Sequence, residues 1–337
     1  MELDTFRPAW WLRGPHAQTL GARMLRSRSG IALERERIEL PDGDFLDLDW
    51  AHCVTDGVTA DGPLVVVLHG LEGCARSNYA LELYRTLGAH GLRAVGLNFR
   101  SCSGEPNRLP RMYHSGETGD IASTLELLAG RNGTAPLGIV GVSLGGNALL
   151  KYLGERGGTR KTRVTAAVAV SVPYDLAAGS DHIERGFSKF YRMYLVHRLR
   201  KKILAKSTIL EGHIDVGKAL RARTFREFDD RATAPLHGFK DADDYYARSS
   251  ASHYLGRIDV PTLLIHALDD PFLPAGSLPI YEAKQNPHIE ISISERGGHI
   301  GFVSGKPWAP VFWAEQRAAE FLAGKLNPDC ARSRSEG

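Results

Sequence analysis

The sequence predicts an α/β fold in which a mostly parallel central sheet is flanked by helices and interrupted by one helical insertion. Short apolar runs alternate with helical stretches from residue 64 to residue 170, which indicates right-handed βαβ units. This alternation stops after Pro173 and resumes at Thr262. The chain has 337 residues, of which 43% are hydrophobic, and that is enough to bury a sizeable core.

The individual elements follow from the changing hydrophobic period. Alternating residues over 33–40 and 45–50 predict a hairpin that turns at 41–43. Short apolar runs indicate buried strands at 64–68, 93–98, 137–142, 164–170, 262–266 and 288–294. Helices are expected at 77–90, 116–129, 145–155 and 278–285, and a last one at 310–326.

This pattern divides the chain into three parts. Residues 1–172 and 256–326 are expected to form the α/β core, and residues 173–255 a helical cap inserted after about the sixth strand. Residues 327–337 are polar and are expected to be a flexible tail. Because ligands of open α/β sheets bind beyond the carboxyl ends of the strands, we expect the cap to cover the site.

Composition excludes several function classes. A net charge of +3, from 42 basic and 39 acidic residues, gives no reason to expect nucleic acid binding. Cys53, Cys74, Cys102 and Cys330 lie far apart without metal-binding or redox spacing, so we expect reduced thiols and neither metal nor cofactor. The sequence shows no secretory signal and no apolar window of about 20 residues. We therefore expect a cytoplasmic protein.

The strongest chemical motif is G-x-S-x-G at residues 141–145. It follows the predicted strand 137–142 and precedes a helix, which is the context of a nucleophile elbow. In that turn the Ser143 hydroxyl points outward, and glycines are required because other side chains would collide. The alternative is a glycine-rich turn that carries an ordinary serine.

A second glycine turn, at residues 69–73, comes directly after the strand at 64–68. In enzymes with a nucleophile elbow, a loop at this position donates one of two backbone N–H groups to the oxyanion. The expected pair is the N–H of Leu71 and the N–H of Leu144. The alternative is a plain turn.

A serine needs a base, and the chain offers 13 histidines. His299 lies just past the last predicted strand among small residues, which would let a loop carry its imidazole over Ser143. His69 is expected to be structural, and His266 to be buried in its strand. His16, His114 and His253 could support the site from a distance.

The acid should follow the strand at 262–266, and two aspartates occur there before Pro271. The usual loop spacing favours Asp270, whose carboxylate would orient His299 and stabilise its imidazolium form. Asp269 would then cap the loop, although the opposite assignment stays open.

Motifs along nearly the whole chain resemble the YheT-like family of α/β-hydrolases, bacterial relatives of the ABHD-type esterases and the yeast medium-chain ester synthases. They lie at residues 6–12, 16, 18–20, 98–107, 113–118, 141–146, 269–272 and 297–302. The resemblance implies an α/β-hydrolase fold, a Ser143–Asp270–His299 triad and the hydrolysis of carboxylic esters, with no substrate named. Its members are predicted serine esterases.

Two segments outside the triad have two interpretations each. The loop at 100–107 either lines the pocket rim or is held by its own hydrogen bonds. Trp10 and Trp11 either pack over the core as an N-terminal strap or contact ligand.

The cap contains a basic amphipathic stretch at 188–206, with apolar residues at every fourth position from Phe187 to Ile203. It either packs as a lid helix with solvated charges outside or docks on an anionic lipid surface.

The predicted activity is hydrolysis of small-molecule or lipid-like esters with short to medium acyl chains. Three alternatives stay open, namely acyl transfer to an alcohol, aminopeptidase-like amide cleavage with Glu72 facing a substrate ammonium, and a non-catalytic binding module.

Overall fold

The computed structural model describes residues 6–27, 29–52, 58–59, 61–158 and 162–327. Its main sheet has eight strands in the order β1-β2-β4-β3-β5-β6-β7-β8. The pairs β1–β2 and β2–β4 are antiparallel, and all other pairs are parallel. The strands are β1 (Ala32–Glu39), β2 (Phe45–His52), β3 (Leu64–Leu68), β4 (Arg93–Asn98), β5 (Leu137–Val142), β6 (Val164–Val170), β7 (Thr262–Ala267) and β8 (Ile289–Ser294).

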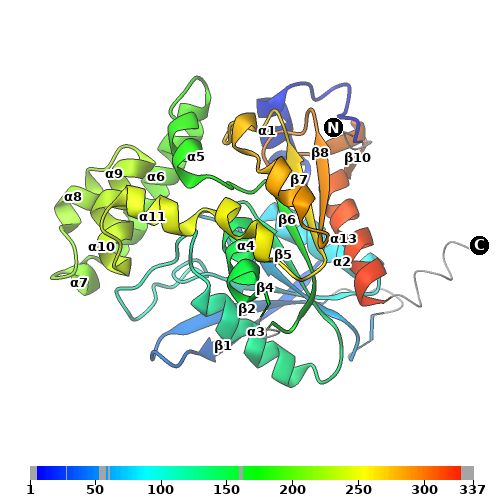
Figure 1. The fold of residues 1–337 in the computed structure, drawn as a ribbon, viewed down its shortest axis with the longest axis horizontal. Helices are drawn as coiled ribbons and strands as arrows, with labels where there is room; N and C mark the ends of the chain where they lie inside the picture. The colour runs from blue at the N-terminus through cyan, green and yellow to red at the C-terminus, as the bar shows by residue number, and fades with distance from the viewer. Residues whose placement is uncertain (1–5, 28, 53–57, 60, 159–161, 328–337) are drawn as a thin grey trace, which may run out of the picture.

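Helices cover both faces of this sheet. On one face lie α2 (Asn78–Ala89) and α13 (Trp313–Leu326), which pack against each other (Figure 1). The other face carries α3 (Gly119–Arg131), α4 (Leu144–Arg156) and α12 (Ile280–Gln285). Two separate apolar cores result. Successive residues of β3 alternate between them, with Val66 in the core beside α4 and Val65 in the core beside α13.

Between β6 and β7 the chain forms only helices and turns among the described residues; we call residues 171–261 the helical insertion. Its longer helices are α5 (Leu176–His182), α6 (Ser188–Ala205) and α11 (Ala242–Ser249). The other elements are the short α-helices α7 (Ser207–Leu210), α8 (Val216–Leu220), α9 (Phe225–Phe228) and α10 (Ala234–His237), the π-helix η1 (Asp229–Thr233) and the 3₁₀-helix η2 (Ala251–Arg257). Figure 1 shows α6 to α11 gathered at one side of the molecule. The predicted α/β-hydrolase architecture, with its insertion after the sixth strand, is confirmed.

The ends of the chain hold elements that the sequence did not indicate. Helix α1 (Pro15–Leu25) precedes the sheet, and the hairpin β9 (Val303–Lys306) and β10 (Ala309–Phe312) precedes α13. The expected start of the last helix at 310 was therefore wrong, because residues 309–312 pair with β9 instead. A short 3₁₀ turn, η3 (Ala275–Ser277), precedes α12. Beyond Asn327 the predicted tail lies outside the described residues.

Trp10 and Trp11 behave differently from each other. Trp11 packs beside Ala9 and Phe312, and its indole donates a hydrogen bond to the carbonyl of Gly305 at 3.0 Å. Trp10 is 67% exposed, so core packing holds for Trp11 alone.

The loop after β4 is held by its own polar network and does not line the pocket described below. The fully buried Arg100 guanidinium donates to Asp120, Asp44 and Asp42 at 2.7–2.9 Å. The side chain of Asn107 donates to the second oxygen of Asp44 at 2.8 Å. These bonds hold the loop against the β1–β2 turn. Of the two interpretations, a pocket rim or a loop held by hydrogen bonds, the structure agrees with the second.

Replacing Arg100 by Met should destabilise the fold by about 3–5 kcal/mol, because buried carboxylates lose the cation that compensates their desolvation. Urea unfolding monitored by circular dichroism measures this change. The matched control is Arg108→Gln, which removes a cation from an exposed pair with Glu39 and should change stability little. Equal losses in the two variants would contradict a special role for the buried network.

Candidate active site

Ser143 occupies a sharp turn between β5 and α4. Its backbone has φ 54° and ψ −120°, a left-handed conformation that is unfavourable for a residue with a side chain. The turn leaves no room beside it, because a Cβ on Gly141 would lie 2.6 Å from the carbonyl of Gly145. A Cβ on Gly145 would lie 2.6 Å from the carbonyl of His69. The glycines of the motif are therefore required by packing.

His299 reaches Ser143 from the loop after β8. Its Nε2 lies 3.1 Å from Ser143 Oγ, so the hydroxyl can donate to the ring. Phe272 stacks on the imidazole with ring centres 4.1 Å apart and planes within 4°. The backbone N–H of His299 donates to Thr19 Oγ1 on α1 at 2.9 Å. Phe272 thus covers one face of the imidazole, and Thr19 holds the backbone of His299 in place.

The two aspartates after β7 have different partners. Asp270 Oδ2 accepts the Nδ1 proton of His299 at 2.7 Å, and its Oδ1 accepts the backbone N–H of Phe272 at 2.8 Å. Asp269 Oδ1 instead accepts the N–H groups of Gly297 and Gly298, both at 2.8 Å, in the loop that carries His299. The geometry brings Ser143, His299 and Asp270 into one hydrogen-bonded series and leaves Asp269 outside it.

The loop at 69–73 lies directly beside the serine. A Cβ on Gly70 would be 3.1 Å from Ser143 Cβ. The N–H groups of Gly70 and Glu72 donate to the hydroxyls of Tyr79 and Tyr113, each at 2.8 Å. Within the described residues, the N–H groups of Leu71 and Leu144 have no such acceptor. They are the donors that a substrate oxygen next to Ser143 could use.

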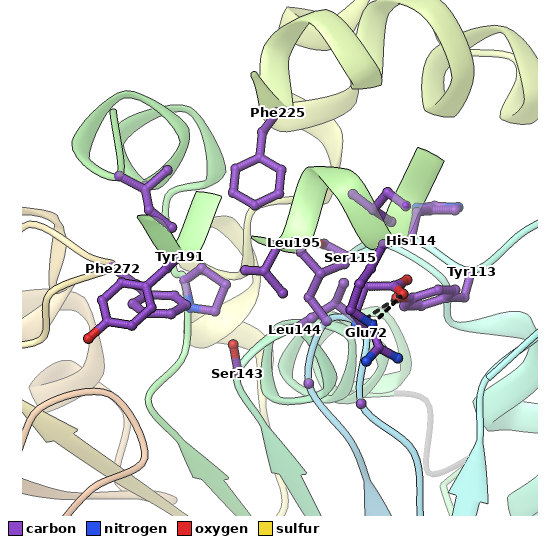
Figure 2. A pocket seen from close by; sticks show the side chains of 18 of the residues that line it. Glu72, Tyr113, His114, Ser115, Ser143, Leu144, Tyr191, Leu195, Phe225 and Phe272 are labelled. Atoms are coloured by element: carbon purple, nitrogen blue, oxygen red, sulfur yellow. Dashed lines mark hydrogen bonds and ion pairs between the residues drawn. The ribbon is translucent and has the colours of Figure 1, made fainter. Parts of the chain in front are cut away.

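Glu72 joins this loop to the insertion. Its carboxylate is 2.9 Å from Lys202 Nζ and 3.4 Å from Arg198 Nε, both on α6. It also accepts a hydrogen bond from the hydroxyl of Tyr113 at 2.8 Å, and Figure 2 shows these two side chains side by side. Glu72 itself has φ 56°. The lid interpretation expected the charges of α6 to lie in solvent. Lys202 and Arg198 instead pair with Glu72, so this expectation does not hold for all of them. The inner cations of α6 hold the backbone next to Leu71.

Several supporting residues were not identified from the sequence. Gln18 on α1 accepts the N–H of Val303 at 2.7 Å and donates to its carbonyl at 3.0 Å. Arg26 donates to the carbonyl of Ile300 at 2.7 Å. Together with Thr19 they fasten α1 to the loop of His299. The resemblance to the YheT-like family included residues 18–20 but gave these residues no chemical role. Their partners lie some 280 residues further along the chain.

The other histidines separate into distinct environments. His69 is fully buried; its Nδ1 donates to the carbonyl of Gly70 at 2.8 Å and its Nε2 accepts the N–H of Phe99 at 3.1 Å. Burial lowers its pKa to about 3. Burial also lowers the pKa of His266 to about 4 and that of His114 to about 3. His114 lines the pocket, whereas His16 contacts Tyr191 at its edge and His253 lies elsewhere on the surface.

A pocket of about 540 Å³ opens above Ser143, within the size range of small-ligand sites. Figure 2 shows Leu195 and Phe225 on the side of the pocket opposite Ser143, with Tyr191 and Phe272 beside it. Most of its apolar wall comes from the insertion, namely Leu176, Leu195, Leu199, Phe225, Phe228, Ala232 and Leu236.

Besides Glu72, the wall includes the half-buried acid Asp229. Asp229 accepts hydroxyl protons from Tyr246 at 2.7 Å and Thr233 at 2.6 Å, and burial raises its pKa to about 6.

The described residues contain no group of His, Cys, Asp and Glu side chains that could hold a metal ion. No helix in the described ranges is long and apolar enough to cross a bilayer. Cys74 and Cys102 form no disulfide, and Cys53 and Cys330 lie outside the described residues.

Fold and site geometry together define a hydrolase class, and comparison with known proteins agrees. The family model described as "alpha/beta hydrolase fold" matches residues 63–306, more than half of the chain. The chain belongs to this family. The expectation of an enzyme of the hydrolase class is thereby confirmed.

Within the family, the chain is similar to YheT of Escherichia coli (strain K12), an esterase by name, with 42% identity over 92% of this chain and 91% of that protein. It is 32% identical to the phospholipase ABHD3 of Mus musculus over 90% of this chain and 74% of the relative. The esterase Pf2001 of Pyrococcus furiosus shares the fold with a TM-score of 0.58 at 14% identity, over 97% of this chain and 99% of that one. The predicted YheT-like relationship is confirmed.

The buried His266 should make the protein sensitive to acid. Its folded pKa of about 4 lies below the value of about 6.5 in an unfolded chain. The unfolded state therefore takes up a proton first as pH falls, and stability decreases by roughly 1.4 kcal/mol per pH unit between these two values.

His266→Met should remove this contribution, since Met cannot be protonated. Between pH 6.5 and 5, the wild type should lose about 2 kcal/mol more than the variant in urea unfolding. At pH 7.5 the His266 side chain is neutral in the folded and the unfolded state. The difference in unfolding free energy between wild type and variant at this pH therefore measures the change in packing alone. If the free energy of unfolding fell equally with pH in the wild type and in His266→Met, His266 would have the same pKa in the folded and unfolded states, and the prediction would be wrong.

Proposed function

We propose that this enzyme is a serine hydrolase that cleaves carboxylic esters through an acyl-enzyme. Ser143 is the nucleophile, His299 the base and Asp270 the orienting acid. The observation that carries the proposal is the hydrogen-bonded series from Ser143 Oγ through His299 to Asp270, at 3.1 and 2.7 Å. The positive φ of Ser143 supports it, because that backbone conformation turns a nucleophile toward the substrate.

In the first step, His299 Nε2 takes the hydroxyl proton while Ser143 Oγ attacks the ester carbonyl. The N–H groups of Leu71 and Leu144 stabilise the negative oxygen of the tetrahedral intermediate. His299 then protonates the departing alcohol. In the second step, water gives a proton to His299 and attacks the acyl-enzyme carbonyl. The resulting tetrahedral intermediate breaks its bond to Ser143 Oγ, His299 returns the proton to that oxygen, and the acid leaves. Asp270 stabilises the imidazolium form in both steps.

The proposed substrates are small or lipid-like esters with short to medium acyl chains. The apolar wall that the insertion contributes fits an acyl chain, and we propose residues 173–255 as a cap over the core formed by 1–172 and 256–326. Relatives named esterase, phospholipase and monoacylglycerol lipase support ester substrates, the last at 31% identity over 73% of this chain and 57% of that yeast protein. Cytoplasmic location stays a prediction.

Two alternatives are weakened by particular contacts. An aminopeptidase-like enzyme would need a free carboxylate for the substrate ammonium, but Glu72 already pairs with Lys202 and Arg198. A non-catalytic module would not need the hydrogen bonds that join Ser143, His299 and Asp270. Acyl transfer to an alcohol uses the same side chains as hydrolysis, so product analysis separates these two reactions.

A fluorophosphonate probe should label the purified wild type, and Ser143→Ala should abolish labelling because the nucleophilic oxygen is gone. With p-nitrophenyl esters from acetate to palmitate, turnover should peak at a short or medium chain length. Ser143→Ala and His299→Ala should each lower kcat by about 10⁴-fold or more.

Ser304→Ala, a serine on the β9 hairpin outside the pocket, is the matched control and should label like the wild type. Labelling that persists in Ser143→Ala would refute the assignment of the nucleophile. An unlabelled wild type without ester turnover would favour the binding-module alternative.

The two adjacent aspartates should differ sharply in their effects. Asp270→Asn should lower kcat by about 10⁴-fold, because the amide favours the wrong imidazole tautomer. Asp269→Asn should have a much smaller effect on kcat, with a loss of thermal stability from the weakened loop contacts at Gly297 and Gly298. Steady-state kinetics and thermal melting of both variants test this. The reverse order of kcat losses would assign the acid to Asp269.

A further inference from the structure

The large apolar side chains that remain exposed are concentrated at one place. Helix α1 exposes Leu20 (41%) and Met24 (83%). The start of α6, with the residue before it, exposes Phe187 (47%), Phe190 (62%), Met193 (55%) and Tyr194 (44%). We call these six side chains the α1–α6 patch. They make up more than half of the large hydrophobic side chains exposed in the described part of the chain.

The two helices lie side by side, although more than 160 residues separate them in sequence. The His16 ring packs on Phe187 with centres 4.6 Å apart, and His16 Nδ1 is 3.1 Å from the hydroxyl of Tyr191. The Arg23 guanidinium donates to the hydroxyl of Tyr194 at 3.4 Å and lies over its ring. The patch is therefore a surface of the folded molecule that both helices build.

This surface adjoins the opening of the pocket above Ser143. Leu20 and Tyr194 belong to the patch and also line the pocket, as does Arg23 between them. Phe190 and Met193 lie one helical turn or less from Tyr194 and line no part of the pocket. A flat surface that covered the patch would therefore lie next to the pocket opening.

The two segments that carry the patch are positively charged, and the acid that precedes the second one, Glu184, is paired with Arg192 on α6. Residues 6–27 and 185–210 contain no Asp or Glu, whereas they contain many Arg and Lys side chains. The exposed ones are Arg7, Arg13, Arg23, Arg185, Lys189 and Lys201, together with Arg198, which also pairs with Glu72. Lys202 on α6 and Lys206 directly after it are not exposed, because they contact Glu72 and backbone carbonyls. Arg185 and Lys189 thus place outward positive charge at the start of the helix, where the exposed apolar residues are.

We propose that the α1–α6 patch docks on the surface of an anionic phospholipid bilayer and presents the pocket opening to it. Exposed aromatic and long apolar side chains surrounded by Arg and Lys are the composition of interfacial membrane contacts. Each basic side chain near an anionic surface adds attraction. A second copy of this chain fits less well, because a two-fold contact would face one cationic surface with another. The proposal rests on the proposed function, since it names the surface from which ester substrates enter.

Flotation of the full chain with vesicles tests the docking. Binding should be strong to phosphatidylcholine vesicles that contain phosphatidylglycerol, and weak to phosphatidylcholine alone. The double variant Phe190→Ser and Met193→Ser should lower the partition coefficient at least tenfold, and Lys189→Glu should lower it about fivefold. Tyr281→Ser and Lys284→Glu on α12 are matched controls outside the patch and should bind as the wild type does.

Turnover of a soluble p-nitrophenyl ester keeps this proposal separate from the proposed function. It should be unchanged in all these variants, because none of the substituted side chains lines the pocket. Equal binding of patch and control variants, or no vesicle binding by a wild type that hydrolyses the soluble ester, would overturn the docking proposal. Patch variants that dissociate a wild-type dimer in sedimentation, without vesicle binding, would assign the surface to a second copy. Vesicle binding without any ester turnover would refute the proposed function and leave docking supported.

Discussion

The left-handed backbone at Ser143 is the constraint on which the candidate site depends. A chain that leaves β5 and enters α4 within one residue can do so only if Gly141 and Gly145 have no side chains, because each would lie within 3 Å of backbone atoms. The same tight contact presses α4 against the carbonyl of His69. The loop at 69–73, which carries the proposed oxyanion donor Leu71, is therefore positioned by the packing of the serine turn. The unfavourable φ of Ser143 is offset by the buried sheet on either side.

Ion pairs extend this arrangement into the insertion. Glu72, one residue after the proposed donor Leu71, has a left-handed backbone and a carboxylate held by Lys202 and Arg198. A buried carboxylate without these cations would be costly, so the position of α6 and the conformation of the loop stabilise each other. Because α6 also supplies Leu195 and Leu199 to the pocket wall, the same helix contacts both the pocket and the loop of the proposed oxyanion donor Leu71.

Sequence reasoning succeeded where the signal is local. Most strands were located within a residue or two, because short apolar runs mark the buried ones. The motif at 141–145 indicated Ser143 and the loop spacing favoured Asp270, and the structure places both within hydrogen-bond distance of His299. Their catalytic roles stay predictions. Contacts between distant segments escaped prediction, since nothing near Gln18 or Thr19 indicates a partner at Val303 or His299. The hairpin at 303–312 was assigned to a helix in part, because its short strands carry little periodic signal.

The N-terminal segment shows why such distant contacts matter for function. Through Thr19, Gln18 and Arg26, α1 holds the loop of His299, and through His16 and Arg23 it touches α6. One helix thus contacts both the loop that carries the proposed base and the helix that forms the pocket wall. The surface proposed to face lipid and the hydrogen bond between Thr19 and the backbone of His299 therefore belong to the same eleven-residue helix.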